Sequence, residues 1–223
     1  MKYTDNFLKL MGFLYDNPDY SDSQNPIEFL NAWEYIHEKI SKIEKKEITF
    51  LEIGADKGLW SIMFFAVCKS LDKVPSYTTA TLIEDDNQHY ENMGFSMDNF
   101  LNYSSRNKNI YKVQDFYSQF GYEYNIINGN SQENDTKDRV EEYHAKYDIV
   151  FIDGDHTYGG VINDISLYSP MCKGLLIFHD ILPKERKIHY IQVYPAIIDS
   201  NISLDIEFID DGNLMGIGIK NLL

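Results

Sequence analysis

The sequence predicts an α/β fold: a doubly wound, mostly parallel sheet of seven strands with helices on both faces. Two observations carry this prediction. From residue 48 onward, short apolar runs typical of buried strands alternate with longer segments of helical spacing. Near the end, residues 204–220 hold two apolar runs around the turn Asp211-Gly212-Asn213, which predicts a hairpin and therefore one strand antiparallel to the others.

The expected elements follow in chain order. Residues 16–26 are polar, contain two prolines and predict a loop. The next segment is expected to be a helix, because apolar residues recur at steps of three and four: Phe29, Trp33, Ile36, Ile40 and Ile43. Strands are expected at residues 48–54, 79–84, 124–129, 147–153, 174–180, 204–210 and 214–220, and helices at residues 60–71, 161–173 and 188–200.

The same patterns predict the domain organisation. Residues 1–47 are expected to form a helical extension that packs on the main domain or covers a cleft as a lid, and residues 48–223 form that domain. The polar and aromatic segment at about residues 87–120 predicts a helical insertion. The extension and the insertion are also candidate interfaces for a homo-oligomer, because aromatic residues are enriched at interfaces.

Composition restricts the partners. The chain has 223 residues, and 43% of them are hydrophobic, as in a globular protein with its own core. Lys and Arg total 20 against 35 Asp and Glu, which gives a formal net charge of −15. Such a field repels phosphate backbones, so we expect a small-molecule substrate and no nucleic acid.

Targeting signals are not apparent in the sequence. The first residues lack the basic start and apolar stretch of a signal peptide, and no apolar run approaches the ~20 residues of a membrane span. Cys68 and Cys172 lie in apolar surroundings without metal or redox spacing. We therefore expect a cytoplasmic protein with reduced thiols and no membrane contact.

Chemically active residues gather where the expected strands end. Glu52 with Gly54, Glu84, Asn130, Asp153 with His156, and Asp180 come from five separate segments. Parallel strands present their carboxyl ends at one edge, and ligands bind there, near the point where the strand order reverses. The sequence therefore predicts one site at this edge.

The turn after the first strand, LEIGADKGLW, indicates a cofactor site. Gly54 allows positive φ, and Gly58 allows close packing of helix against strand. The dinucleotide pattern G-x-G-x-x-G fails, because its second glycine is Asp56 and its last position is Leu59. This disfavours a nicotinamide oxidoreductase, whereas Glu52 suits an ammonium group.

Two further strand ends fit a nucleoside. Glu84 can accept hydrogen bonds from a ribose diol, while Asp85 beside it can instead cap the next helix. Asn130 and Ser131 can read an adenine edge or form a plain turn.

Six segments, in order and spacing, resemble the class I S-adenosylmethionine-dependent methyltransferases: LEIGADKG, LIEDD, INGNS, YDIVFIDGDHTYGGV, GLLIFHDI and GNLMGIGIK. The segment from Phe151 to Asp180 more narrowly resembles a branch of sugar and macrolide O-methyltransferases and cephalosporin-hydroxylase-like proteins. The resemblance covers roughly residues 48–220 and implies a Rossmann-like methyltransferase fold. It also implies a cofactor site made of Glu52, Gly54, Ala55, Gly58, Glu84, Asp85, Asn130, Ser131 and Asp153.

The resemblance further implies how a hydroxyl is activated. Related enzymes hold a divalent ion with acids that here correspond to Asp153 and Asp180, but the residue after Asp180 is Ile181 and not a ligand. Magnesium dependence therefore stays open at this stage. His156 and Asp155 are the two candidate catalytic bases, and an imidazole pKa near ~6.5 favours His156 at neutral pH.

The expected function is therefore S-adenosylmethionine-dependent O-methylation of a small polyhydroxylated substrate such as a sugar or glycoside. A rival hypothesis is a catalytically silent methyltransferase fold that serves as a binding or scaffold subunit. Asp56 and Ile181, the two departures from the family pattern, favour the rival.

Overall fold

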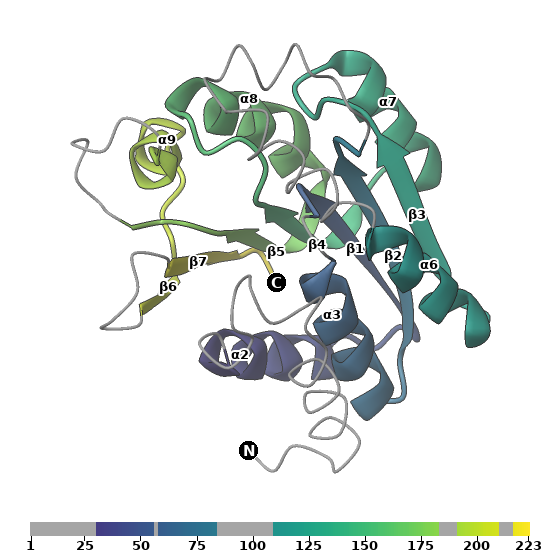
Figure 1. Cartoon of the computed structure of the whole chain (residues 1–223). Coiled ribbons are helices and arrows are strands. Elements are labelled where there is room, and N and C mark those ends of the chain that lie inside the picture. Colours follow the sequence, from purple (N-terminus) through teal and green to yellow (C-terminus); the bar gives the residue numbers. More distant parts are fainter. Residues whose placement is uncertain (1–29, 56–57, 84–108, 183–190, 210–215) are drawn as a thin grey trace.

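The structure is a computed structural model and describes residues 30–55, 58–83, 109–182, 191–209 and 216–223. Its seven-stranded sheet has the order β3-β2-β1-β4-β5-β7-β6. The strands are β1 (Glu47–Ile53), β2 (Val74–Thr81), β3 (Glu123–Asn128), β4 (Tyr147–Ile152), β5 (Cys172–Phe178), β6 (Ile206–Ile209) and β7 (Gly216–Asn221). The helices are α2 (Leu30–Ser41), α3 (Leu59–Ser70), α6 (Asn109–Gln119), α7 (Asn134–Tyr143), α8 (Tyr158–Tyr168), the 3-10 turn η1 (Ser169–Met171) and α9 (Val193–Asp199). They lie on both faces of the sheet (Figure 1).

Strand directions confirm the predicted fold class. β1 pairs in parallel with β2 and β4, β2 with β3, and β4 with β5. β7 runs antiparallel to both β5 and β6, as the closing hairpin predicted. The chain winds outward from β1 to β3 on one side and from β4 to β5 on the other. The strand order therefore reverses between β1 and β4, where the rule for open α/β sheets places a ligand.

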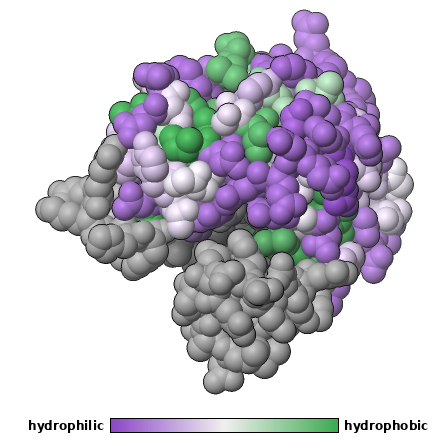
Figure 2. All heavy atoms as spheres, turned by 90° about the horizontal axis from the view of Figure 1, so that it is seen from above, coloured by the Kyte–Doolittle hydropathy of each residue, from purple (hydrophilic) through white to green (hydrophobic). Residues whose placement is uncertain are grey.

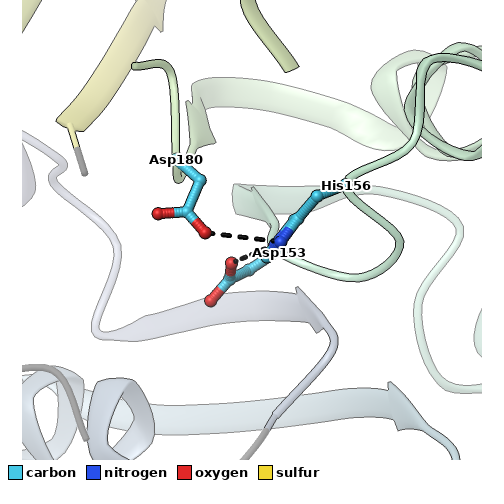
Figure 3. Close-up of side chains that lie close together, drawn as sticks. All are labelled: Asp153, His156 and Asp180. Carbon is cyan, nitrogen blue, oxygen red and sulfur yellow. Dashed lines mark hydrogen bonds and ion pairs between the residues drawn. The ribbon is translucent and has the colours of Figure 1, made fainter. Parts of the chain in front are cut away.

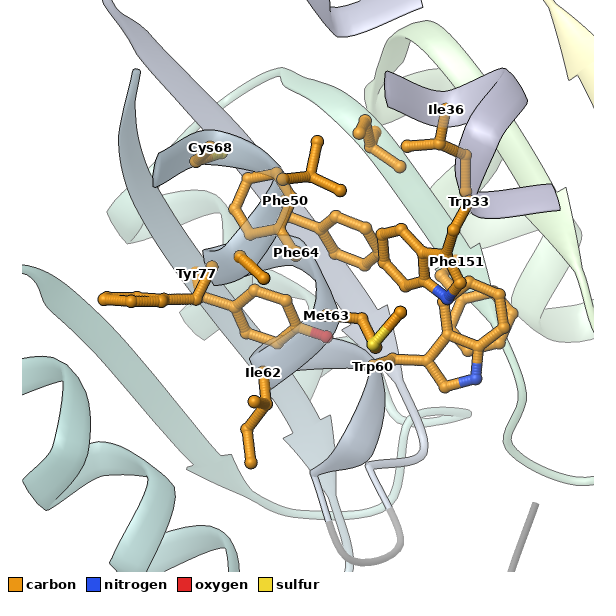
Figure 4. Packing of buried hydrophobic residues seen from close by; sticks show 14 of the residues in the cluster. Trp33, Ile36, Phe50, Trp60, Ile62, Met63, Phe64, Cys68, Tyr77 and Phe151 are labelled. Carbon is orange, nitrogen blue, oxygen red and sulfur yellow. The ribbon is translucent and has the colours of Figure 1, made fainter. Parts of the chain in front are cut away.

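Two apolar cores lie on opposite faces of the sheet. Phe50 and Phe151 face the layer of α2, α3 and α6, while Leu51 and Ile152, the next residues along, face α7, α8 and α9. This alternation is why β1 and β4 carry apolar residues on both of their faces. In the first core Trp60 stacks near Phe151, with ring centroids 4.2 Å apart (Figure 4).

The N-terminal helix belongs to the first core. Trp33 of α2 packs on Trp60 of α3 with ring centroids 4.8 Å apart, and Ile36 and Ile40 are fully buried. Residues 1–29, including the expected loop at 16–26, lie outside the described residues. The boundary at residue 47 and the lid role stay predictions.

One helix was not predicted, and another forms part of the expected insertion. α7 was not predicted, because its sequence NDTKDRVEEY is polar and buries only Thr136 and Val140. α6 forms from residues 109–119 of the expected insertion and connects two parallel strands, β2 and β3, while residues 87–108 lie outside the described residues. Two parallel strands require a crossover connection, and α6 provides it between β2 and β3.

A buried carboxylate holds β1 and β4 together at their amino ends. Asp148 Oδ2 accepts hydrogen bonds from Thr49 N at 2.7 Å and Thr49 Oγ1 at 2.9 Å, and it pairs with Lys45 Nζ at 2.6 Å. Burial alone would raise the pKa of Asp148, but Lys45 and Thr49 lower it. This contact sets the register of the two strands whose opposite ends carry Gly54 and Asp153.

Within the described parts of the chain, no helix has the length and apolar character needed to cross a membrane. The face over α7, α8 and α9 is largely hydrophilic, with scattered apolar side chains (Figure 2). Cys68 and Cys172 are buried free thiols, as expected.

Candidate active site

Two carboxylates and two imidazoles form a ring at the carboxyl ends of β4 and β5. Asp153 Oδ1 lies 3.2 Å from His156 Nε2 and 3.0 Å from His179 Nδ1. Asp180 closes the ring, because its Oδ2 lies 3.4 Å from His156 Nδ1 and its Oδ1 lies 3.4 Å from His179 Nδ1. Figure 3 shows that Asp153, His156 and Asp180 point toward one another from three different backbone positions. We call these four residues the acid–imidazole ring.

The backbone explains why the ring forms. Asp153 directly follows β4, and its N–H donates to Ile53 O of β1 at 2.8 Å. His179 directly follows β5, and its N–H donates to Ile152 O at 3.3 Å. The next residue, Asp180, has φ +54°, a left-handed conformation that costs energy for a residue with a side chain. Strain of this kind is concentrated at functional sites.

The ring sets the charges of its members. Burial would raise the pKa of Asp153, but His179 and His156 lower it to about 2. Burial would lower the pKa of His156, but the hydrogen bond and charge of Asp153, followed by Asp180, raise it to about 9. Burial raises the pKa of Asp180. The imidazole of His156 is therefore more basic than the ordinary value used in the sequence argument.

The glycine turn after β1 lies against the ring. Gly54 has φ +86°, and its N–H donates to Ala80 O of β2 at 2.9 Å. A Cβ at Gly54 would lie 2.3 Å from the backbone oxygen of Asp153. Ala55 N–H donates to Thr81 Oγ1 at 3.4 Å, and its carbonyl accepts from Gly58 N–H at 2.7 Å. Residues 56–57 of this turn lie outside the described residues.

Glu52 lies on the α3 side of β1 and is 1% exposed. The pKa of Tyr77 is raised well above its ordinary value, first by burial and then by the Glu52 carboxylate. Tyr77 itself stacks between Phe50 and Tyr124, with ring centroids 4.8 Å and 5.2 Å away. Glu52 is therefore a buried carboxylate set among aromatic rings beneath the glycine turn.

The loop after β3 carries Asn130 and Ser131 at this same edge. Asn130 Oδ1 accepts from Gln132 N–H at 3.1 Å, and Ser131 O accepts from Tyr168 Oη at 2.7 Å. Both residues are half-buried. Glu84 and Asp85 lie outside the described residues, so their predicted place at the ribose rests on the sequence alone.

Asp155, the second candidate base, is occupied by its own loop. Its Oδ1 accepts from Thr157 N–H at 2.8 Å, and its Oδ2 accepts from Thr157 Oγ1 at 3.0 Å and from Gln132 Nε2 at 2.9 Å. This carboxylate therefore hydrogen-bonds to its own loop and to Gln132 of the loop after β3, whereas His156 points into the acid–imidazole ring.

The predicted metal pair comes together but does not offer magnesium an all-oxygen site. Asp153, His156 and Asp180 each present a ligand atom within 4.8 Å of the others. Magnesium prefers oxygen ligands, and here the oxygens that line the ring already contact imidazole nitrogens. Ile181 is fully buried and packs toward Gly216 and Gly218 of β7, so it supplies no ligand.

Sequence reasoning missed three residues of this region. His179 was not among the candidate residues, although its place directly before Asp180 at a strand end was a signal. Gln132 carried no signal. Asp164 interrupts the apolar face of α8 and is 0% exposed, so its carboxylate is buried. Burial raises the pKa of Asp164 to about 7, although the Ser131 hydroxyl lowers it.

Solved structures of low sequence identity share this fold. The O-methyltransferase NovP has a TM-score of 0.58 at 14% identity, over 97% of each chain. CalS11, a TDP-rhamnose 3'-O-methyltransferase, has a TM-score of 0.53 at 11% identity, over 96% of this chain and 93% of that chain. MycE, a methyltransferase of mycinamycin biosynthesis in complex with Mg and SAH, has a TM-score of 0.53 at 14% identity, over 95% of this chain. The present chain spans only 53% of MycE.

Sequence comparison identifies the family. A search of curated proteins found no match. A profile described as a methyltransferase domain matches residues 51–181, which is more than half of the chain and includes the glycine turn and the acid–imidazole ring. The chain therefore belongs to this family of methyltransferase domains.

Proposed function

We propose that the protein is an S-adenosylmethionine-dependent O-methyltransferase whose acceptor is a hydroxyl group of a small polyhydroxylated molecule, such as a sugar or glycoside. The observation that carries the proposal is the direct contact between the glycine turn at Gly54 and the acid–imidazole ring at Asp153. A cofactor held by the turn would present its methyl group beside the ring. The names of NovP and CalS11 support O-methylation, and that of CalS11 supports a sugar acceptor.

The cofactor site in this proposal combines four segments. Glu52, Gly54, Ala55 and Gly58 would hold the methionine part, with Asp153 beside them. Glu84 and Asp85 would bind the ribose, and Asn130 with Ser131 would flank the adenine. The close approach of Gly54 to Asp153 supports this assignment, because a turn without a side chain leaves backbone groups free to contact a ligand.

His156 is the proposed base. With Nε2–H donated to Asp153 Oδ1, the neutral imidazole carries its lone pair on Nδ1, which faces Asp180. S-adenosylmethionine, when bound, supplies a methyl group on a positively charged sulfur. His156 Nδ1 would accept the proton of the acceptor hydroxyl, which would make its oxygen nucleophilic toward that methyl group. Asp153 would stabilise the imidazolium that results.

No step of this mechanism passes through a metal ion. Alignment of acceptor and methyl group supplies much of the rate, ~7 kcal/mol or more for well-placed partners. The net charge of −15 supports a small acceptor over a nucleic acid.

Methyl transfer itself tests the proposal. S-adenosylhomocysteine binding is measured by calorimetry, and label from methyl-tritiated S-adenosylmethionine is followed into a panel of glycosides, nucleotide sugars and phenols. We expect cofactor binding and labelling of at least one sugar hydroxyl. Cofactor binding without labelling of any acceptor would favour the silent scaffold, and absence of cofactor binding would refute both.

A further inference from the structure

Two loops of the site, which leave the sheet from different strands, are joined by one side-chain hydrogen bond. The first is residues 129–133 after β3, and the second is residues 153–157 after β4. Gln132 Nε2 donates to Asp155 Oδ2 at 2.9 Å, across 23 residues of chain. In the proposed function, on which this inference rests, the first loop flanks the adenine and the second carries His156.

Asp155 makes the hydrogen bonds that connect the two loops, and we call it the joint between them. Its two oxygens accept three hydrogen bonds, two from Thr157 and one from Gln132. A Cβ at Gly160 would lie 2.3 Å from Asp155 Oδ2, so only glycine leaves room for the carboxylate there. The side chain is therefore held by its own loop, by Gln132 and by the first turn of α8.

Helix α8 is hydrogen-bonded to the loop after β3 and begins directly after the loop that follows β4. Asn163 Nδ2 donates to Gln132 O at 3.0 Å, and Tyr168 Oη donates to Ser131 O at 2.7 Å. At the start of α8, Thr157 Oγ1 accepts from Gly160 N–H at 3.2 Å and caps the helix. The loop after β3 is thus anchored at Ser131 and Gln132, and the contact with Asp155 transmits that position to the loop of His156.

We propose that Gln132 is a positioning residue for methyl transfer: through Asp155 it sets the loop of His156 relative to the loop at the adenine. In this assignment Asp155 is the joint between the loops and not the base. Displacement of a reacting group by about 1 Å can lower a rate by about 10²-fold, so the joint matters for catalysis without touching the substrate.

Hydrogen exchange tests the connection without turnover. S-adenosylhomocysteine bound at the adenine loop should slow exchange of the amides at residues 155–157 in the wild-type protein. In Gln132→Ala the protection should stay at residues 129–133 and fall at least threefold at Thr157. Gln119→Ala, at an exposed glutamine that ends α6, is the matched control and should behave as wild type.

Kinetics separates joint from base. Gln132→Ala and Asp155→Ala should each lower kcat about 10–100-fold, Gln132→Ala with an unchanged pH profile, and the double variant should lose no more than the larger single loss. Asp155→Asn should retain kcat within about fivefold, because its amide can still bond Thr157 and a rotated Gln132. A loss of 10² or more in Asp155→Asn would make Asp155 the base and overturn the assignment.

The failures are distinguishable. Absence of cofactor binding in the wild-type protein would refute the proposed function. Cofactor binding with equal protection of Thr157 in wild type and Gln132→Ala would leave the proposed function intact and refute the joint.

Discussion

Gly54 and Asp153 are in direct backbone contact across the point where the strand order reverses. A Cβ added at Gly54 would lie 2.3 Å from the carbonyl oxygen of Asp153 and 2.7 Å from its carbonyl carbon. The turn after β1 and the acidic end of β4 therefore have no room for a side chain between them. A side chain at Gly54 would therefore displace the backbone of Asp153, a member of the acid–imidazole ring.

Gly54→Ala should damage stability and cofactor binding together. The new methyl group meets backbone atoms that cannot rotate away, and φ +86° is unfavourable for alanine. We expect a lower melting temperature and at least tenfold weaker binding of S-adenosylhomocysteine by calorimetry. Gly121→Ala is the matched control, because Gly121 also has positive φ, +69°, but a Cβ there meets nothing within 4 Å. Equal effects of the two substitutions would show that the contact with Asp153 is unimportant.

His156→Ala should lower kcat by roughly 10²–10⁴ and leave cofactor affinity nearly unchanged, because a base acts on the proton and does not hold the nucleoside. His37→Ala replaces another half-buried histidine, in α2, and should leave kcat unchanged. Wild-type kinetics in His156→Ala would remove this residue from the mechanism.

The pH profile should follow the raised pKa of His156. A base must be unprotonated, so with a pKa of about 9 the rate should rise with pH through neutrality and level off only near pH 9. The measurement is kcat/KM of the wild-type enzyme between pH 6 and 10, and the rising limb should vanish in His156→Ala. A plateau that begins at about pH 6.5 would mean that the carboxylates of the ring do not hold the proton on His156.

Metal removal should leave activity intact. The oxygens of Asp153 and Asp180 that line the ring already contact the imidazoles of His156 and His179. These two carboxylates therefore have cationic partners without a metal ion. We expect unchanged methyl transfer after dialysis against EDTA and no calorimetric signal for Mg²⁺ at millimolar concentration. Activity lost in EDTA and restored by Mg²⁺ would contradict this expectation.

Asp164→Asn should change how stability depends on pH. The folded pKa of Asp164 is about 7 against an ordinary 3.8, so between these values the unfolded chain ionises and the folded protein does not. The group thus lowers the free energy of unfolding as pH rises from about 4 to about 7, by up to about 4 kcal/mol. Asparagine does not titrate. In urea unfolding, the free energy of unfolding of the variant should therefore rise relative to that of the wild type as the pH increases across this interval. A difference in the free energy of unfolding that does not depend on pH would refute the buried neutral acid. Asp115→Asn, at an exposed position of α6, is the control.

Much of the fold could be predicted from the sequence, because buried helices and strands repeat their apolar residues at characteristic spacings. β1 and β4 are buried almost throughout and mostly apolar because both faces are covered, and the predicted parallel sheet and closing hairpin are both present. Helix α7 was not predicted because it buries only Thr136 and Val140. Its sequence therefore shows almost no apolar repeat.

The sequence by itself determined which residues stand at the strand ends, because a strand end is marked by the change from apolar to polar residues. It therefore brought Gly54, Asp153, His156 and Asp180 to one edge. Only the tertiary structure decided where their side chains point. Asp180 turns toward the ring through a left-handed backbone, while Ile181 turns toward β7.

The roles within the site were likewise decided by contacts between distant segments. Asp155 bonds to Gln132 across 23 residues, and His179 bonds to Asp153 across 26, so no local pattern records either pair. The basicity of His156 also arises from carboxylates at the ends of two different strands, first Asp153 and then Asp180, with a smaller contribution from Asp155. The short-range spacing of apolar residues predicts which positions are buried and where strands end. Hydrogen-bond partners and pKa values depend instead on atoms that come within a few ångströms only in the folded chain.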